Sequence, residues 1–334
     1  MLKKVINNFL IFSVLLLSFI ATAQEGLPIY SDYLTENYYL IHPSMAGVSQ
    51  CSQVRLTARK SWLGQEDAPG LQTIAYNGRI SQRSGIGFNA FADQNGFHSQ
   101  SGVYGTYAHH IMFSRDETDL NMLSFGLSAG FLQYRLDQSS FIVGTDRLVD
   151  GVNRNEVNFN MDIGMSYNLG NFFTHFTIKN LLENEGINND AQVTSNLTNY
   201  MLSMGFVIQP RNRNVWFEPS VLIQHRPALN ATIGDFNGKI YRQIKDKLLY
   251  LGFSYRNSFS NVTFEENNSI VEEQLKYISP FVGIKLSKLS FAYTYTQQLN
   301  SSVFQQSGFH QITIGYDFKC RKKRYHCNCP AINY

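Results

Sequence analysis

The sequence is poor in charge, and beyond its first residues it has no long hydrophobic run. Charged residues make up 16% of the 334 positions, whereas about 25% is usual for a soluble domain. After Ala23 no apolar stretch approaches the roughly 20 residues that a membrane-spanning helix needs. The sequence therefore predicts no transmembrane helix in this part of the chain.

The first residues have the pattern of a secretory signal. Two lysines precede an apolar run at 9–20, and Ala21-Thr22-Ala23 gives a small-residue cleavage site. The run has about 12 residues, which is too short for a membrane anchor. No cysteine directly follows the cleavage site, so a lipid anchor is not expected there. We expect residues 1–23 to be a cleaved signal peptide.

Aromatic residues and glycine are abundant, with 25 Phe, 19 Tyr and 24 Gly. Apolar residues alternate with Gly, Ser, Asn and other polar residues over 123–131, 157–169 and 289–296. A soluble sandwich also has this period of two. Runs of such length, however, match the about 9–11 tilted residues of a membrane-spanning strand. The composition and the alternation together favour an all-β protein of the membrane β-barrel class.

The alternation predicts about fourteen antiparallel strands. They are expected at 52–62, 71–79, 85–93, 99–113, 121–135, 156–169, 171–179, 198–209, 214–225, 228–236, 247–257, 273–286, 288–296 and 309–318. Short connections alternate with mostly longer ones, as the periplasmic turns and outer loops of outer-membrane barrels do. We therefore expect a transmembrane outer-membrane barrel over 52–318, with both termini in the periplasm.

Three local features fit this assignment less simply. The connection near Pro227 is short where a long loop is expected, and 237–246 is long where a short turn is expected. Pro219 lies inside a predicted strand. A closed barrel has no edge strand that could tolerate a proline, so a β-bulge is expected at this position.

The segment at 24–51, between the signal and the first strand, includes the irregular apolar stretch YLIHPSMAGVS. Pro43 restricts its turn and removes a donor, while Gly47 permits a positive φ. A disordered leader would be more polar, so we predict a periplasmic lid or a partial plug of the barrel. A docking role and a purely structural clasp are both open. The expected anchors are Tyr38, Tyr39, Ile41 and Met45.

Several motifs carry a family resemblance. An aromatic pair, Tyr38-Tyr39, precedes Pro43-Ser-Met-Ala-Gly47. Further on come an Arg-x-x-Trp-x-Gly motif and an Ala-Pro-x-x-Gln-Thr motif, carried by Arg59, Trp62, Gly64, Ala68 and Pro69. At this spacing along the mature chain, the motifs resemble those of the PorP/SprF family, outer-membrane proteins of the type IX secretion and gliding machinery of Bacteroidota. His42 departs from the pattern, because the family usually has Asn there.

The resemblance implies an integral barrel in the outer membrane of a Gram-negative bacterium, in contact with its lipid, and no enzymatic activity. It implies a role in secretion or surface anchoring of a partner, such as a large adhesin with a C-terminal secretion domain, and contact with periplasmic type IX components. The main alternative is a diffusion channel or small-solute transporter with the same polar lumen. A surface β-sandwich is a third interpretation.

No residue cluster predicts catalysis or a cofactor. His109 and His110 would point to opposite faces of a strand, so they cannot bind one metal together. The acidic residues at 116–119 fit a solvated turn better than a metal site. There is no G-x-S-x-G motif and no phosphate-binding loop. We expect no catalytic residues, no metal and no cofactor.

The C-terminal residues 319–334 form a basic tail rich in cysteine. A secreted barrel has no access to nucleic acid, so the tail is either a solvated segment near anionic lipid or a periplasmic docking site for an acidic partner. The basic residues concerned are Lys319, Arg321, Lys322, Lys323 and Arg324.

The four cysteines are expected at the periplasmic rim of the barrel. Closing the barrel would pair the first strand with the last and bring Cys51 near Cys320. The periplasm permits disulfides, and we hypothesise that Cys51 bonds a cysteine of the tail. Four cysteines allow three full pairings, and a zinc site from the tail cysteines and His326 is the rival interpretation. The remaining tail cysteines are Cys327 and Cys329.

Overall fold

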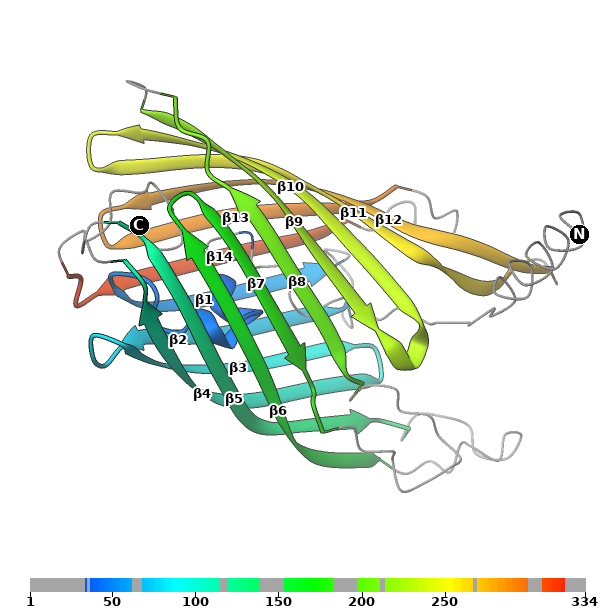
Figure 1. The fold of residues 1–334 in the computed structure, drawn as a ribbon. Helices are drawn as coiled ribbons and strands as arrows, with labels where there is room; N and C mark the ends of the chain where they lie inside the picture. The colour runs from blue at the N-terminus through cyan, green and yellow to red at the C-terminus, as the bar shows by residue number, and fades with distance from the viewer. Residues whose placement is uncertain are drawn as a thin grey trace, which may run out of the picture.

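The structure is a computed structural model, and it describes residue 34 and residues 37–61, 68–114, 119–138, 153–182, 197–210, 214–266, 269–299 and 308–321. The predicted signal peptide lies outside these residues. In the described part of the chain, no helix is long and apolar enough to cross a membrane. Fourteen strands form one closed antiparallel barrel, in which each pairs with its sequence neighbours and the first pairs with the last (Figure 1). The predicted barrel is thus confirmed.

The strands begin and end as follows. They are β1 (Ser52–Ser61), β2 (Gly70–Arg79), β3 (Ser84–Asn95), β4 (His98–Met112), β5 (Asn121–Leu136), β6 (Arg154–Leu169), β7 (Phe172–Lys179), β8 (Asn199–Phe206), β9 (Val215–Arg226), β10 (Ala231–Ile244), β11 (Lys247–Glu266), β12 (Ser269–Leu286), β13 (Leu289–Gln298) and β14 (Phe309–Phe318). In the described part of the chain, the short 3₁₀ helices η2 (Tyr38–Leu40), η3 (Pro43–Met45) and η5 (Pro227–Leu229) accompany them.

The two ends of the barrel differ in their connections. One end holds Ser52 and Phe318, which are partners in the β1–β14 ladder, and the connections that return there include the tight turns at 170–171, 245–246 and 287–288. We call this the turn end and the opposite one the loop end. The loop end has the longer connections, such as the one between β7 and β8, but also two-residue connections between β3 and β4 and between β11 and β12.

Side chains alternate between the lumen and the outer surface. On β4, Thr106 and His110 are buried, whereas Val103, Tyr107 and Ile111 are exposed. The other strands repeat this pattern, with exposed Leu, Ile, Phe and Tyr outside and buried Ser, Thr, Asn and charged residues inside. An apolar outer surface around a polar lumen is the arrangement that a barrel needs in a lipid bilayer.

Two connections expected from the sequence are strands instead. The expected connection at 237–246 is wrong, because β10 continues to Ile244 and pairs with β11 up to the turn at 245–246. The expected loop at 258–272 is also wrong, because β11 and β12 pair with each other as far as Glu266 and Ser269. On β10 the exposed apolar residues Phe236, Ile240 and Ile244 are four positions apart, so strict alternation is hidden there. At 258–266 the backbone is satisfied by pairing within the β11–β12 hairpin.

The β-bulge expected at Pro219 is not present. Pro219 pairs with Gly238 of β10 in unbroken register. On its other side the β8–β9 ladder stops at Gly205 and Ser220, and it resumes only as a bridge between Ile208 and Phe217. Because proline has no amide hydrogen to donate, the chain interrupts one ladder there rather than inserting a residue.

Candidate functional site

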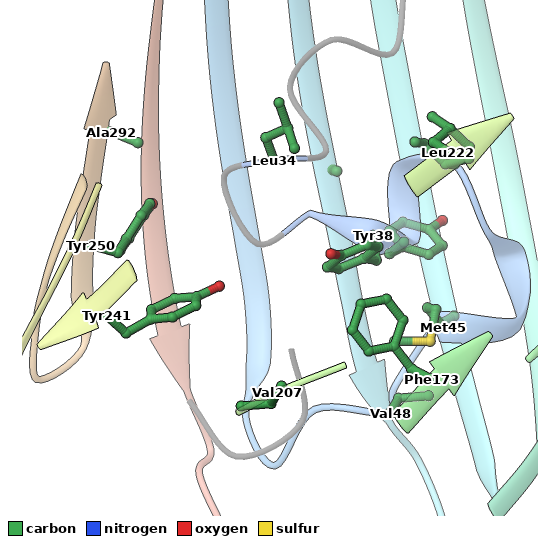
Figure 2. Packing of buried hydrophobic residues seen from close by; sticks show 14 of the residues in the cluster. Leu34, Tyr38, Met45, Val48, Phe173, Val207, Leu222, Tyr241, Tyr250 and Ala292 are labelled. Atoms are coloured by element: carbon green, nitrogen blue, oxygen red, sulfur yellow. The ribbon is translucent and has the colours of Figure 1, made fainter. Parts of the chain in front are cut away.

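The residues before β1 lie inside the barrel. Every residue from Asn37 to Ser49 is buried, and Gln50 is half-buried. We call 37–50 the luminal segment. Figure 2 shows Tyr38 and Met45 enclosed by strands, with Phe173 of β7 between them. The expected anchors Tyr38, Tyr39, Ile41 and Met45 are all at most 5% exposed, so the apolar stretch is indeed shielded from water.

The luminal segment is a compact chain of turns. The backbone N–H of His42 donates to the carbonyl of Tyr38 at 2.8 Å, and that of Met45 donates to the carbonyl of His42 at 2.9 Å. Pro43 opens η3, where its missing donor costs nothing. Gly47 has a φ of 71°, and a Cβ there would lie 2.7 Å from the Cα of Gly85. Pro43 and Gly47 therefore both favour the irregular turn that the sequence predicted at this place.

Inward-facing glycines leave room for this segment on the barrel wall. A Cβ on Gly87 of β3 would lie 2.4 Å from the ring of Tyr39. A Cβ on Gly126 of β5 would lie 2.2 Å from the backbone nitrogen of Ser44. Contacts this short do not occur for real side chains, so the wall and the segment fit each other only because these positions lack a side chain.

Hydroxyl groups of the wall bind the polar side chains of the segment. His42 lies with its Nδ1 2.8 Å from the Oγ1 of Thr177 and its Nε2 2.7 Å from the Oγ of Ser203. The Oγ of Ser44 meets that of Ser166 at 2.5 Å. Three neighbouring strands, β6 to β8, are thereby joined to one short turn.

Burial fixes the protonation of His42 and Tyr39. The pKa of His42 lies well below its ordinary value of 6.5, first because the ring is fully buried and then because His175 and Lys179 are near. The neutral ring donates from one nitrogen and accepts at the other, which its two hydroxyl partners both allow. Burial also raises the pKa of Tyr39, whose OH lies 2.9 Å from the Oγ1 of Thr106.

A buried charge cluster meets the segment on the next two strands, β9 and β10. Glu218 of β9 forms an ion pair with Lys239 of β10 at 3.2 Å. Tyr38 donates its OH to the same carboxylate at 3.1 Å, and Tyr241 donates to its other oxygen at 3.3 Å. The ammonium also lies 5.1 Å from the centre of the Tyr38 ring. Buried charges need such complete pairing.

A second ion pair binds the backbone of the segment. Lys179 of β7 lies 3.3 Å from Asp162 of β6 and donates to the carbonyl of Leu40 at 3.2 Å. The carbonyl is an end of η2 that helix hydrogen bonds leave unsatisfied. The charged pair thus caps the segment as well as joining two strands.

An arginine holds the segment at the turn end. The Nε of Arg79 donates to the carbonyl of Gly47 at 2.9 Å, and its Nη2 donates to that of Val48 at 3.1 Å. The backbone N–H of Gly47 in turn donates to Asn77 at 3.3 Å. Both side chains come from β2, so one strand end fixes the point at which the segment leaves the lumen.

A disulfide joins Cys51 and Cys320 across the β1–β14 seam. The N–H of Arg321 donates to the carbonyl of Gln50 at 3.2 Å beside it. Inside the same seam Arg55 pairs with Asp317 at 2.7 Å, and Lys285 reaches the other oxygen of that carboxylate. The end of the luminal segment and the start of the tail are therefore linked covalently.

The other predicted residues lie elsewhere or outside the described residues. Arg59 is on β1 near the loop end, with its guanidinium 5.5 Å from the centre of the Phe309 ring. Ala68 and Pro69 precede β2 at the same end. The structure does not bring these family-motif residues to the luminal segment. Trp62, Gly64, Lys322, Lys323, Arg324, Cys327 and Cys329 lie outside the described residues.

Several residues that bind the segment were not expected from the sequence. They are Arg79, Asp162, Lys179, Glu218 and Lys239. A usable signal did exist, because charged residues at inward positions of alternating strands must find a partner in the lumen. The sequence gives no means of matching them, since partners such as Tyr38 and Glu218 are 180 residues apart.

The site offers binding rather than reaction chemistry. His109 is exposed and His110 is buried, so the two do lie on opposite faces. Among the described residues, no group of three or more His, Cys, Asp or Glu could hold a metal ion. What the lumen presents to the segment is a set of hydroxyls, glycines and paired charges.

Comparison with known proteins places the chain among membrane barrels. The sequence model of the family described as type IX secretion system membrane protein PorP/SprF matches residues 22–316. No curated protein matches the sequence significantly.

Solved structures are similar at low identity. A FadL homologue of Pseudomonas aeruginosa has a TM-score of 0.48 at 10% identity, covering 80% of this chain and 90% of its own. The outer membrane protein Omp33 of Acinetobacter baumannii has a TM-score of 0.43 at 8% identity, covering 81% of this chain and 100% of its own. The CymD monoaromatic hydrocarbon channel has a TM-score of 0.45 at 9% identity, covering 89% and 95%.

Proposed function

Since the chain belongs to the PorP/SprF family of type IX secretion system membrane proteins, we propose that this outer-membrane β-barrel supports the secretion or surface anchoring of a partner protein. The partner would be a client with a C-terminal secretion domain, such as a large adhesin. The family consists of non-enzymatic outer-membrane proteins, and the barrel would act by binding. Periplasmic components of the secretion system would bind its turn end.

The observation that carries this proposal is the luminal segment. Its residues are buried and bound to strands β8 and β9, and this supports our proposal that the segment plugs the barrel against free diffusion. A diffusion channel needs an open path, whereas an anchoring barrel needs only a stable wall and surfaces for its partners. We therefore favour anchoring over transport.

The orientation forms part of the proposal. The turn end would face the periplasm and the loop end the cell surface, because short connections usually face the periplasm in such barrels. Both termini would then lie in the periplasm, because β1 begins and β14 ends at the turn end. An epitope tag after Tyr334 should be inaccessible to antibody on intact cells.

Client retention tests the anchoring role directly. Deleting the gene should release into the medium, or hold inside the cell, a protein with a C-terminal secretion domain, and the same protein should co-purify with the barrel. Complementation by the wild-type gene is the control. If the surface proteome is unchanged by the deletion, the anchoring proposal is wrong.

Conductance separates this function from the alternative of a channel or small-solute transporter, whose polar lumen this barrel shares. The purified barrel should show no steady ion current in a planar bilayer. A variant lacking residues 37–49 should conduct, because the deletion removes the plug but keeps Cys51 and the strands. Steady current through the wild-type barrel would favour the channel.

The tail remains a second proposed docking site. Lys319 and Arg321 are exposed at the turn end, and with Lys322, Lys323 and Arg324 they would bind an acidic periplasmic partner. Replacing all five by Gln should reduce partner pull-down and client secretion. Unchanged pull-down and secretion would mean that the tail is only a solvated segment.

Mass spectrometry without reduction should show Cys51 joined to Cys320. Metal analysis then decides whether the remaining cysteines bind zinc.

A further inference from the structure

One hairpin continues beyond the barrel wall. The β10–β11 ladder ends with Ile233 opposite Ser258, and the β12–β13 ladder ends with Tyr277 opposite Gln298. The β11–β12 pair nevertheless runs on to Glu266 and Ser269. Figure 1 shows this pair reaching past its neighbours at the loop end. We call residues 262–266 and 269–273 the projecting ribbon.

The base of the ribbon combines a shift in strand register with side-chain hydrogen bonds. The register between β11 and β12 shifts between Asn257 and Asn261, which is a β-bulge or similar irregularity. Ser258 donates its Oγ to the carbonyl of Ser260 at 2.8 Å, and the Oγ of Ser260 donates to the carbonyl of Asn230 at 3.1 Å. Bulges bend strands and change their direction, and here hydrogen bonds to the β9–β10 turn fix that direction.

The backbone edges of the ribbon are available for pairing. Among the described residues, no strand pairs with the outer edge of 262–266 or of 269–273. An edge strand presents a row of N–H and C=O groups that can take up one more strand. Each edge has five residues, about 16 Å of strand, which is enough for a short extended peptide.

The charge of the ribbon indicates what would bind. Each strand carries two glutamates, Glu265 and Glu266 on one and Glu272 and Glu273 on the other, and the ribbon contains no basic residue. A second copy of this chain would place like charges side by side, which is destabilising. A strand that carries lysine or arginine would gain both main-chain hydrogen bonds and charge complementarity.

We propose that the projecting ribbon binds a partner protein by β-strand addition, and that the added strand is an extended, basic segment. This inference rests on the proposed function, in which the partner is the exported client, and it assigns the docking surface to the loop end. The luminal segment and the ribbon then have separate tasks, with the segment closing the barrel and the ribbon holding the client.

A peptide assay on the purified full-length barrel in detergent tests the surface itself. The probe is a fluorescent ten-residue peptide of alternating Lys, Thr and Val, with the same peptide carrying Glu in place of Lys as the charge control. A third peptide with alternate backbone N-methyl groups keeps the charge but cannot complete a ladder. We expect the Lys peptide to bind at least tenfold more tightly than either control, and to slow hydrogen exchange in 259–276.

Two variants locate the binding. In one, residues 261–274 are replaced by Asn-Gly, which shortens the hairpin to the height of its neighbours. In the other, Glu265, Glu266, Glu272 and Glu273 are changed to Gln, which keeps the ribbon length. The first should abolish binding of the Lys peptide and the second should weaken it about tenfold. Heat-modifiable gel migration checks that both barrels fold.

Several results would overturn the inference. Equal binding of the N-methylated peptide would mean charge attraction alone, and equal binding to the shortened variant would place the site elsewhere. Wild-type dimers that disappear when the hairpin is shortened would assign the strand edge to a second copy of this chain.

In cells, the shortened variant should lose client retention while its lumen stays non-conducting. A client that is unaffected by gene deletion contradicts the proposed function, whereas one affected by deletion but not by shortening contradicts only the ribbon.

Discussion

The two walls of the lumen hold the chain together in different ways. Strands β3 to β8 face the luminal segment mainly with glycines and hydroxyls, such as Gly126 and Ser203. They also carry the ion pair between Asp162 and Lys179. Strands β9 to β14 and β1 carry ion pairs that join neighbouring strands, such as Glu218 with Lys239 and Asp235 with Arg256. The first wall is complete only when the segment fills it. The charged side chains of the second wall pair mainly with one another.

This difference suggests which part can move. Neutral hydrogen bonds between the segment and the wall form together when the segment binds and break together when it leaves. Each one alone contributes little to stability. Buried ion pairs are costly to separate, so they favour a wall that keeps its shape. Tyr38 links the two systems, because it belongs to the segment and donates to Glu218 of the charged wall.

The largest effect is expected from breaking the charged wall. Lys239→Met leaves the Glu218 carboxylate buried without its cation, which should cost about 3–5 kcal/mol of unfolding free energy. Urea unfolding in lipid vesicles, followed by tryptophan fluorescence, measures it. Lys285→Met is the matched control, since Asp317 keeps Arg55 as a partner. The double variant Glu218→Gln with Lys239→Met should regain part of the loss. Equal effects of Lys239→Met and Lys285→Met would mean that a second cationic partner, which Asp317 has in Arg55, does not protect a buried carboxylate.

The next effect is expected on the glycine wall. Gly126→Leu would place a side chain where the backbone of Ser44 lies, and overpacking of this kind costs about 1–3 kcal/mol or more. The luminal segment should leave its place, and the barrel should conduct ions in a planar bilayer. Gly105→Leu is the control, because nothing lies within 4 Å of a Cβ at that outward position. A non-conducting Gly126→Leu barrel with normal stability would mean that the fit is looser than the contacts imply.

A pH effect should arise where His42 of the segment binds β7 and β8. The pKa of His42 is lowered by burial and by His175 and Lys179, and Lys179 itself pairs with Asp162. The unfolded chain therefore binds a proton that the folded chain does not. Stability is full above about pH 6.5 and falls by about 1.4 kcal/mol for each pH unit below it, until the folded pKa is reached.

Comparing wild type with His42→Gln isolates this residue. The amide can keep one donor and one acceptor toward Thr177 and Ser203, but it does not titrate. The drop in unfolding free energy between pH 7.5 and pH 5 should be smaller in the variant. An identical drop in both proteins would show that other groups cause the acid sensitivity.

The smallest effect is expected from one hydroxyl of the segment. Tyr39→Phe removes the hydrogen bond to Thr106, which should cost about 0.5–1.5 kcal/mol. Tyr107→Phe is the matched control, since its OH meets Ser84 on the exposed surface and its loss should change stability by less. If the two variants are equally stable, the hydroxyl of Tyr39 adds nothing to the binding of the segment.

Local patterns in the sequence predicted most of the barrel and part of the site. Alternation over stretches such as 157–169 located the strands, because each side chain of a strand points to one of only two faces. The apolar stretch before the first strand indicated a shielded segment. The stretches at 237–246 and 258–272 were misread as connections. In the first, apolar residues recur only at every fourth position, at Phe236, Ile240 and Ile244, and in the second the strands continue by pairing with each other.

The sequence by itself determined that the chain forms an antiparallel barrel with an irregular apolar segment at its start. These properties depend on residues close together in the chain. Only the tertiary structure decided that the segment lies in the lumen, that Gly87 and Gly126 make room for it, and that Glu218 receives Tyr38. Those contacts depend on how the barrel closes, and closure brings together residues that no local pattern relates.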